Sequence, residues 1–279
     1  MNGRAGGFTL LELLVVVVLG AVAIGAAYQT LTLQERASRH QNAIITTLET
    51  NRTAIDVLAA ELREISAADG DLLMAAPESL TFRAFRKAGI VCQVDPPGLD
   101  VWVLSDAPFA AGDRVLVFQD FDPTTTDDDA WSGPAVVTGV GAAAGGCAAA
   151  WSKPTARLSL SGLTVDPTNI SPGGPVRSYE VLTYGHYQIG GEWSFGQRVE
   201  GRPVVPLVGP LAPPEQRGLV FRYYDAAGTP LSAPLAAPDL RRVARIEVKV
   251  RAATPGAVVG SGNGTYVDSL VMQINLRGN

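Results

Sequence analysis

Residues Phe8–Ala27 read FTLLELLVVVVLGAVAIGAA, and this stretch decides how the whole chain is organised. Sixteen of its 20 residues are Ala, Val, Ile, Leu or Phe, and Glu12 is its only charged residue. A helix of this length rises about 30 Å, which matches the hydrocarbon thickness of a bilayer. The stretch therefore predicts a membrane-spanning helix near the N-terminus.

The overall composition is that of a globular protein with one such segment. The 279 residues are 47% hydrophobic, carry a formal net charge of −5 and include two cysteines. These values exclude a disordered chain, a strongly basic nucleic-acid binder and a disulfide-dense scaffold. Apolar residues elsewhere do not form many long runs, which excludes a multi-span membrane protein. We therefore expect a membrane segment attached to a soluble body.

A short basic segment, MNGRAGG, precedes the apolar stretch. It contains Arg4 and no acidic residue, which predicts a cytoplasmic N-terminus and a body delivered across the membrane. A cleaved secretory signal is the alternative, with Ala26 and Ala27 as its cleavage site. The apolar run exceeds the ~7–15 residues of a normal signal core, which argues against that alternative.

Glu12 is the unusual residue of the apolar stretch. A carboxylate inside a bilayer costs ~2.5–3.5 kcal/mol on insertion scales, so such residues are normally excluded or functional. The plainest interpretation is a charge near the membrane edge that reaches water by tilting or snorkelling. The residues around Glu12 provide a second interpretation.

Residues 6–13, GGFTLLEL, resemble the processing site of type IV prepilins, in which a short basic leader ends in Gly and the apolar helix follows. Glu12 is the fifth residue counted from Phe8, as in that family. The resemblance implies cleavage between Gly7 and Phe8 by a membrane prepilin peptidase, with N-methylation of Phe8. It also implies that Glu12 meets the Phe8 amine of a neighbouring subunit in a filament. Such a buried pair is costly to leave half-made, so it sets the axial register of packing.

The segment Tyr28–Ala68 contains neither Pro nor Gly and predicts an amphipathic continuation of the helix. Its apolar residues form one stripe at helical spacing: Ile44, Leu48, Ile55, Leu58, Leu62 and Ile65. Asp69-Gly70-Asp71 is typical of a helix end. We expect Phe8–Ala67 to form one helix of about 90 Å, as the resemblance to pilins implies. A membrane anchor followed by an ordinary amphipathic helix is the alternative.

Beyond Leu72, short β-like runs broken by Gly and Pro predict a β-rich body. The expected strands are Ser79–Ala84, Leu99–Leu104, Asp113–Phe118, Ala135–Val140, Ala156–Leu160, Ser178–Ile189, Gly218–Tyr224, Arg242–Arg251 and Thr265–Leu276. The last two alternate apolar and polar residues around the turn-rich Gly260–Gly264, which predicts an antiparallel hairpin.

The expected fold class is therefore α+β and pilin-like. A long N-terminal helix, transmembrane and then amphipathic, packs on a mostly antiparallel β domain. The expected divisions are 1–7 for the cleaved leader, 8–27 for the membrane or filament-core helix, 28–68 for the amphipathic half and 69–279 for the body.

Parts of the chain also resemble a subgroup, the PilW-like minor pilins and the related GspJ-like minor pseudopilins. The similar segments are Ala54–Arg63, Ala111–Phe118, Gly218–Gly228 and Leu240–Val250. This resemblance is patchy between Gly133 and Pro214.

Cys92 and Cys147 lie beyond the membrane segment, in a compartment where disulfides form. Two cysteines allow a single intramolecular pairing, and closing this loop would stabilise the fold by ~4 kcal/mol in the chain-entropy model. We favour the disulfide on grounds of compartment; two free, buried thiols are the alternative.

An acidic run makes a weak candidate for calcium binding, because oxygen ligands on a loop suit Ca²⁺. Its members are Asp120, Asp122, Asp127, Asp128 and Asp129. The run lacks the glycine and glutamate positions of an EF-hand, and a solvated surface loop is the favoured interpretation.

Motifs for catalysis, metal binding or cofactor binding are absent from the sequence, so we expect neither an enzyme nor a cofactor. The leading hypothesis is a minor pilin of a type IV pilus, processed by prepilin peptidase and incorporated at low copy near the tip. Its expected partners are other major and minor pilins, the inner-membrane assembly platform and inner-membrane lipid, with no direct support for nucleic acid.

The hypothesis places the protein first in the inner membrane, with a cytoplasmic N-terminus and a periplasmic body, and then in the pilus at the cell surface. A minor pseudopilin of type II secretion is the first alternative, because it would share the same fold and processing. A membrane-anchored periplasmic binding protein or enzyme that never polymerises is the second alternative.

Overall fold

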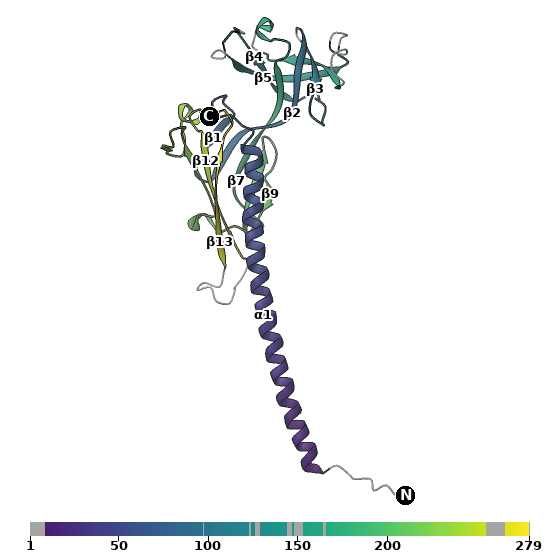
Figure 1. Cartoon of the computed structure of the whole chain (residues 1–279), viewed down its shortest axis with the longest axis vertical. Helices are drawn as coiled ribbons and strands as arrows, with labels where there is room; N and C mark the ends of the chain where they lie inside the picture. Colours follow the sequence, from purple (N-terminus) through teal and green to yellow (C-terminus); the bar gives the residue numbers. More distant parts are fainter. Residues whose placement is uncertain are drawn as a thin grey trace, which may run out of the picture.

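The computed structural model describes residues 9–96, 98–122, 124–125, 129–143, 147, 153–163, 166–254 and 266–278. One long helix, α1 (Leu10–Leu62), leads from the N-terminal end into a β-rich body (Figure 1). Its 53 residues correspond to about 80 Å of helix. The predicted α+β fold class is confirmed.

Both ends of α1 differ from the expected Phe8–Ala67. The helix begins after Thr9, whose backbone is extended and whose side chain accepts a hydrogen bond from the Glu12 backbone N–H. It ends at Leu62, and residues 63–70 form turns that lead into the first strand. The amphipathic stripe continues past this end, because Ile65 is buried although it lies outside the helix.

The described part of the body contains strands and three short helical segments. The strands are β1 (Leu72–Ala75), β2 (Ser79–Asp95), β3 (Gly98–Val103), β4 (Arg114–Gln119), β5 (Ala130–Gly141), β6 (Thr155–Ser161), β7 (Pro175–Ile189), β8 (Glu192–Val199), β9 (Val205–Val208), β10 (Leu219–Tyr224), β11 (Pro230–Leu231), β12 (Arg245–Ala253) and β13 (Val267–Asn275). The helical segments are α2 (Ala237–Leu240) and the 3₁₀ turns Pro167–Asn169 and Pro214–Gln216.

The strands expected from the sequence are present, with shifted ends. The strand expected at Arg242–Arg251 begins at Arg245, because α2 and the turn after it occupy the residues before it. β12 and β13 pair in antiparallel register from Arg245 with Asn275 to Ala253 with Val267, as the predicted hairpin requires. The expected turn Gly260–Gly264 lies outside the described residues. Sequence patterns did not predict β1, β8, β9 or β11.

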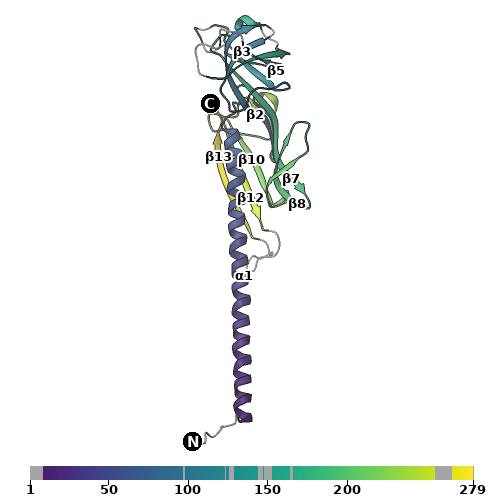
Figure 2. The same cartoon turned by 90° about the vertical axis from the view of Figure 1, so that its right-hand side faces the viewer.

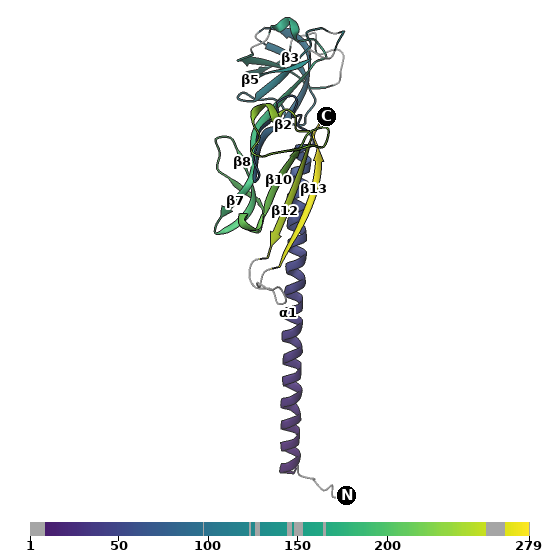
Figure 3. The same cartoon turned by 90° about the vertical axis from the view of Figure 1, so that its left-hand side faces the viewer.

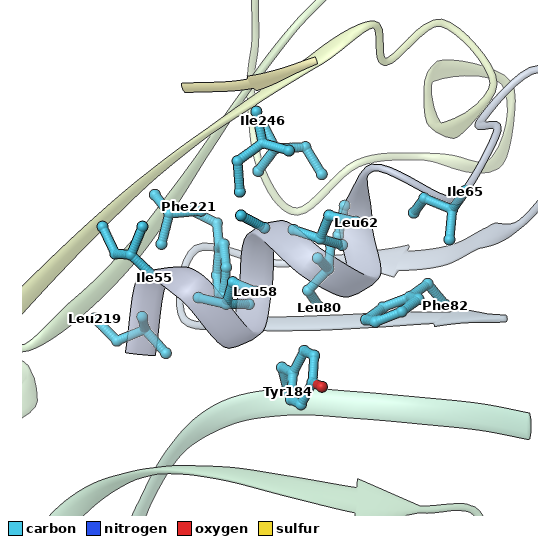
Figure 4. Close-up of a cluster of buried hydrophobic side chains, with 14 of the residues drawn as sticks. Ile55, Leu58, Leu62, Ile65, Leu80, Phe82, Tyr184, Leu219, Phe221 and Ile246 are labelled. Atoms are coloured by element: carbon cyan, nitrogen blue, oxygen red, sulfur yellow. The ribbon is translucent and has the colours of Figure 1, made fainter. Parts of the chain in front are cut away.

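The proximal body, as we define it, is the part of the molecule packed around the C-terminal half of α1. A four-stranded antiparallel sheet, ordered β11-β10-β12-β13, lies on one side of the helix (Figures 2 and 3). β1, β8, β9 and the adjoining parts of β2 and β7 lie on the other side. Figure 4 shows Leu58 of α1 between Phe221 of the first sheet and Tyr184 of the second. The helix is therefore the centre of this core.

The distal lobe is the second part, formed by β3–β6 with the adjoining ends of β2 and β7. Its strands pair in the order β2-β3-β6-β5-β4-β7, and the pairing of β7 with β2 closes the ring. A separate apolar cluster, which includes Val91, Val101 and Val117, fills this small barrel. The lobe lies beyond the C-terminal end of α1 (Figure 1). Ring closure gives it a core to which, among its described residues, strands and not helices contribute the walls.

Candidate functional site

The N-terminal half of α1 is exposed or only partly buried in the structure. From Thr9 to Thr46 no residue is buried, whereas eight residues between Thr47 and Leu62 are buried. α1 is the one helix in the described residues that is long and apolar enough to cross a membrane. Its exposed large apolar side chains are concentrated between Leu10 and Leu33, and such a surface marks a site for lipid or for a protein partner.

Glu12 lies in the first turn of α1, with its side chain exposed. Its backbone N–H donates to the Thr9 hydroxyl at 3.2 Å, so Thr9 caps the helix. The spacing of Thr9 and Glu12 is also that of a capping box, which sequence reasoning had not used. A carboxylate in the first turn is stabilised by the positive end of the helix dipole. Gly7 and Phe8, the expected cleavage and methylation residues, lie outside the described residues.

Asn51 fixes the position of α1 on the four-stranded sheet. It is 1% exposed, and its side-chain oxygen accepts a hydrogen bond from the Ala252 backbone N–H at 3.0 Å. Its amide nitrogen donates to the Asp268 carboxylate at 3.3 Å. Sequence reasoning missed this residue, although it fills the gap between Leu48 and Ile55 in the apolar stripe. A buried polar group with two such partners specifies one register of helix against sheet.

Arg86 fixes the C-terminal end of the same helix to the second sheet. Its guanidinium contacts the Glu61 carboxylate at 3.1 Å and the Glu180 carboxylate at 3.0 Å. All three side chains are partly exposed, so the network adds a modest stabilisation.

A buried ion pair joins the proximal body to the distal lobe. Asp71, just before β1, contacts Arg177 of β7 at 3.3 Å and accepts the Ser66 backbone N–H at 3.0 Å. The Arg177 guanidinium lies 3.9 Å from the ring centre of Phe85 and 3.7 Å from that of Trp131. Both rings stabilise the cation through their faces. We call these residues the neck.

Burial shifts the protonation equilibria of the neck. Burial raises the pKa of the Asp71 carboxyl, and the nearby Arg177 opposes this rise. Burial lowers the pKa of Arg177 to about 10, while Asp71 acts in the opposite direction. Each ion thus compensates part of the other's desolvation.

Cys92 and Cys147 are joined by a disulfide in the distal lobe. Their Cα atoms are 5.5 Å apart and their sequence separation is 55. The Cys147 carbonyl oxygen also accepts a hydrogen bond from the Trp102 indole N–H at 2.8 Å. These contacts hold residue 147 against the barrel wall.

The acidic loop after β4 is only partly described. The exposed Asp122 carboxylate accepts hydrogen bonds from the Thr124 backbone N–H at 3.0 Å and from its hydroxyl at 2.7 Å. These bonds lower the pKa of Asp122. Asp127 and Asp128 lie outside the described residues, and the described residues contain no group of three His, Cys, Asp or Glu side chains suited to a metal. The calcium hypothesis therefore stays a prediction.

Comparison with known proteins identifies the N-terminal segment. A family model described as the prokaryotic N-terminal methylation motif matches residues 2–28. Neither a search of curated proteins nor a search of solved structures found a match for the chain. The motif and the apolar helix support a protein of the pilin or pseudopilin type with a single-pass membrane anchor.

Proposed function

We propose that this chain is a minor pilin, a structural subunit that enters a type IV pilus at low copy. One observation carries the proposal: the methylation motif at residues 2–28 runs directly into a helix half in which no described residue is buried. After removal of the leader, the apolar part of this half, residues 8–27, would lie in the inner membrane and then pack among the equivalent helices of a filament. Transfer of its apolar surface from lipid to a helix bundle leaves that surface covered in both states.

Glu12 is proposed to set the axial position of the subunit. Cleavage after Gly7 would create a positive amine on Phe8, and methylation of that amine retains its charge. The exposed carboxylate of Glu12 could pair with this amine on a neighbouring subunit. Since an unpaired charge among apolar helices is costly, only registers that form the pair would be stable.

The distal lobe favours a position near the end of a filament. It projects beyond the C-terminal end of α1, along the direction in which a parallel neighbour would be stacked (Figure 1). In a continuous stack the lobe would compete for space with the bodies above it. At the tip it would meet other minor pilins or an external surface instead.

The proposal also assigns the processing and membrane partners. Prepilin peptidase would cut between Gly7 and Phe8, and the inner-membrane assembly platform would move the mature subunit from lipid into the filament. The Cys92–Cys147 disulfide is consistent with a periplasmic body, because disulfides persist in oxidising compartments.

The test compares Glu12→Val with Glu35→Val in cells that assemble pili. We expect both variants to be cleaved and to reach the membrane, since neither change removes the apolar helix. Glu12→Val should be depleted at least ten-fold from sheared pili. Glu35→Val should be retained, because Glu35 is exposed and pairs with Arg39 on its own helix.

Mass spectrometry of the mature chain should show methylated Phe8 at the N-terminus. An uncleaved chain in the membrane would contradict processing as a pilin. A cleaved chain that is absent from sheared pili would contradict the minor-pilin role and favour a pseudopilin.

A further inference from the structure

The proximal body contains a cavity of about 440 Å³ on the side of the four-stranded sheet that faces away from α1. Phe221 and Tyr223 of β10 are buried toward the core, whereas Val220, Arg222 and Tyr224 alternate with them and face outward. We call this cavity the β10 groove. Its main outer wall consists of Pro77, Glu78, Pro230, Leu231 and Ala233.

The groove exists because β11 covers only one end of β10. β11 pairs with Tyr223 and Tyr224 alone. Farther along, β10 is approached by the turn before β2, where the Pro77 carbonyl oxygen accepts the Phe221 N–H at 2.8 Å. The Tyr223 hydroxyl donates to the Ala76 carbonyl oxygen at 2.7 Å and fixes that turn. The wall is thus positioned by hydrogen bonds to β10 itself.

The charged residues of the groove fall into two groups. Arg222 contacts the Glu247 carboxylate at 3.1 Å, and Gln273 donates to the same carboxylate at 3.2 Å. Within that group the charge of Arg222 is therefore neutralised by Glu247. Arg217 and Lys249 also line the groove, and neither has an ion-pair partner within the described part of the chain. They leave two cations available to an incoming anion.

Arg217 has an unusual backbone. Its φ of 57° and ψ of 56° place it in the left-handed region, and it is the one non-glycine residue with positive φ in the described ranges. Its N–H donates to the Pro214 carbonyl oxygen at 2.8 Å, which closes the 3₁₀ turn. Glycine adopts this conformation at lower cost, so the turn alone does not call for an arginine. The side chain at the groove is the feature that remains to be explained.

We propose that the β10 groove binds an extended protein segment that carries a carboxylate side chain beside apolar residues. Arg217 and Lys249 would bind the carboxylate, and the surface of Pro77, Pro230 and Leu231 would contact the apolar side chains. The volume is within the ~300–1,000 Å³ range of ligand pockets. Glu78 lies in the same groove and would repel a phosphate backbone that continues past the two cations, whereas a single carboxylate can be placed away from it, so a peptide is favoured over nucleic acid. This inference does not depend on the proposed function.

The experiment is a selection from a phage library of random 12-residue peptides against the full chain in lipid nanodiscs. We expect the selected peptides to share an Asp or Glu next to Leu, Ile, Val or Pro. A synthetic copy of the most frequent peptide is then used to measure affinity. The double variant R217A/K249A should bind it at least ten-fold more weakly, since charge-assisted hydrogen bonds are lost. Replacing the acid of the peptide by its amide should have a similar effect.

Arg202→Ala is the matched control, because Arg202 is exposed and lies outside the groove. It should retain affinity within two-fold, and circular dichroism should show that all variants are folded. No enrichment, peptides without an acid, or unchanged affinity in R217A/K249A would each overturn the proposal. Tighter binding of a 20-nucleotide single-stranded DNA, lost in the same variant, would also overturn it and assign the groove to nucleic acid.

Discussion

The proximal body and the distal lobe solve the same packing problem in different ways. In the proximal body α1 lies between two sheets, and its residues Ile55, Leu58 and Leu62 are part of the core. The described part of the distal lobe has no helix in its core and is closed by a ring of strands and one disulfide. One core therefore depends on α1, whose other half is exposed, and the other core does not.

The support of α1 is thereby separated from the surface at the far end of the molecule. A change in the distal lobe should leave α1 in place, while a change in the proximal body should loosen the helix. The neck is the exception, because its ion pair between Asp71 and Arg177 joins the two parts.

The largest expected effect follows from Asp71→Asn at the neck. The substitution removes the charge that compensates buried Arg177, so we expect the free energy of unfolding to fall by about 3–5 kcal/mol. Urea denaturation of the full chain in detergent would measure it. Glu180→Gln, in a partly exposed ion pair with Arg86, should cost less than about 1 kcal/mol. The double variant D71L/R177M should recover part of the loss. Equal effects of Asp71→Asn and Glu180→Gln would contradict the expected energetic difference between the buried pair and the partly exposed one.

The next largest effect is expected for Leu58→Ala. Leu58 is 0% exposed at the centre of the proximal core, so the cavity should cost about 3 kcal/mol. Hydrogen exchange should increase in β10 and β12 and remain unchanged in β3–β6. Leu19→Ala, at a residue 63% exposed on the same helix, should leave the body unaffected. Faster exchange throughout the distal lobe after Leu58→Ala would contradict the independence of the two cores.

Removal of the disulfide by C92S/C147S tests the distal lobe. We expect a loss of about 2–3 kcal/mol, at the low end for natural disulfides because the barrel retains its strand pairing. Hydrogen exchange should increase in β3 and β6 while α1 residues 47–62 keep their protection. Loss of protection along α1 would mean that the distal lobe supports the helix, contrary to the comparison above.

The smallest effect is a pH dependence confined to the proximal body. Burial lowers the pKa of His186, which lies on β7 against Trp193 with ring centres 4.8 Å apart. The unfolded chain then binds more protons than the folded chain below about pH 6.5, so stability should fall as pH decreases from there toward the folded pKa. His186→Gln should flatten this slope between about pH 5.5 and 7.5. The distal strands β3–β6 contain no histidine, and an equal slope in their hydrogen exchange would contradict the assignment.

Local patterns predicted the regular elements well and their long-range pairing poorly. The stripe from Ile44 to Ile65 and the alternation of β12 follow from burial of one face, which sequence shows directly. β9 was missed because it has four residues and contains Pro206, which weakens any strand signal. The closed ring depends on pairing of β2 with β7, about a hundred residues apart, and no local pattern specifies it.

The same limit applies to the candidate site. Glu12 was recognised because its charge stands alone in an apolar stretch; the motif match at residues 2–28 includes it, and its role in register stays a prediction. The neck was not foreseen, since Asp71 and Arg177 are 106 residues apart and each resembles a surface residue in sequence. Asn51 has a weak signal, a polar residue within an apolar stripe, which becomes meaningful only when its partners on β12 and β13 are known.

The two long strands β2 and β7 have a further consequence for the chain under tension. They pair from Ser79 with Gly185 to Ile90 with Pro175, and they run from the proximal body into the distal lobe. A pulling force on the lobe, resisted at α1, would act along these strands. Because each strand is covalently continuous between the two parts, two backbones would share the load in parallel, and the hydrogen bonds between them would not be sheared.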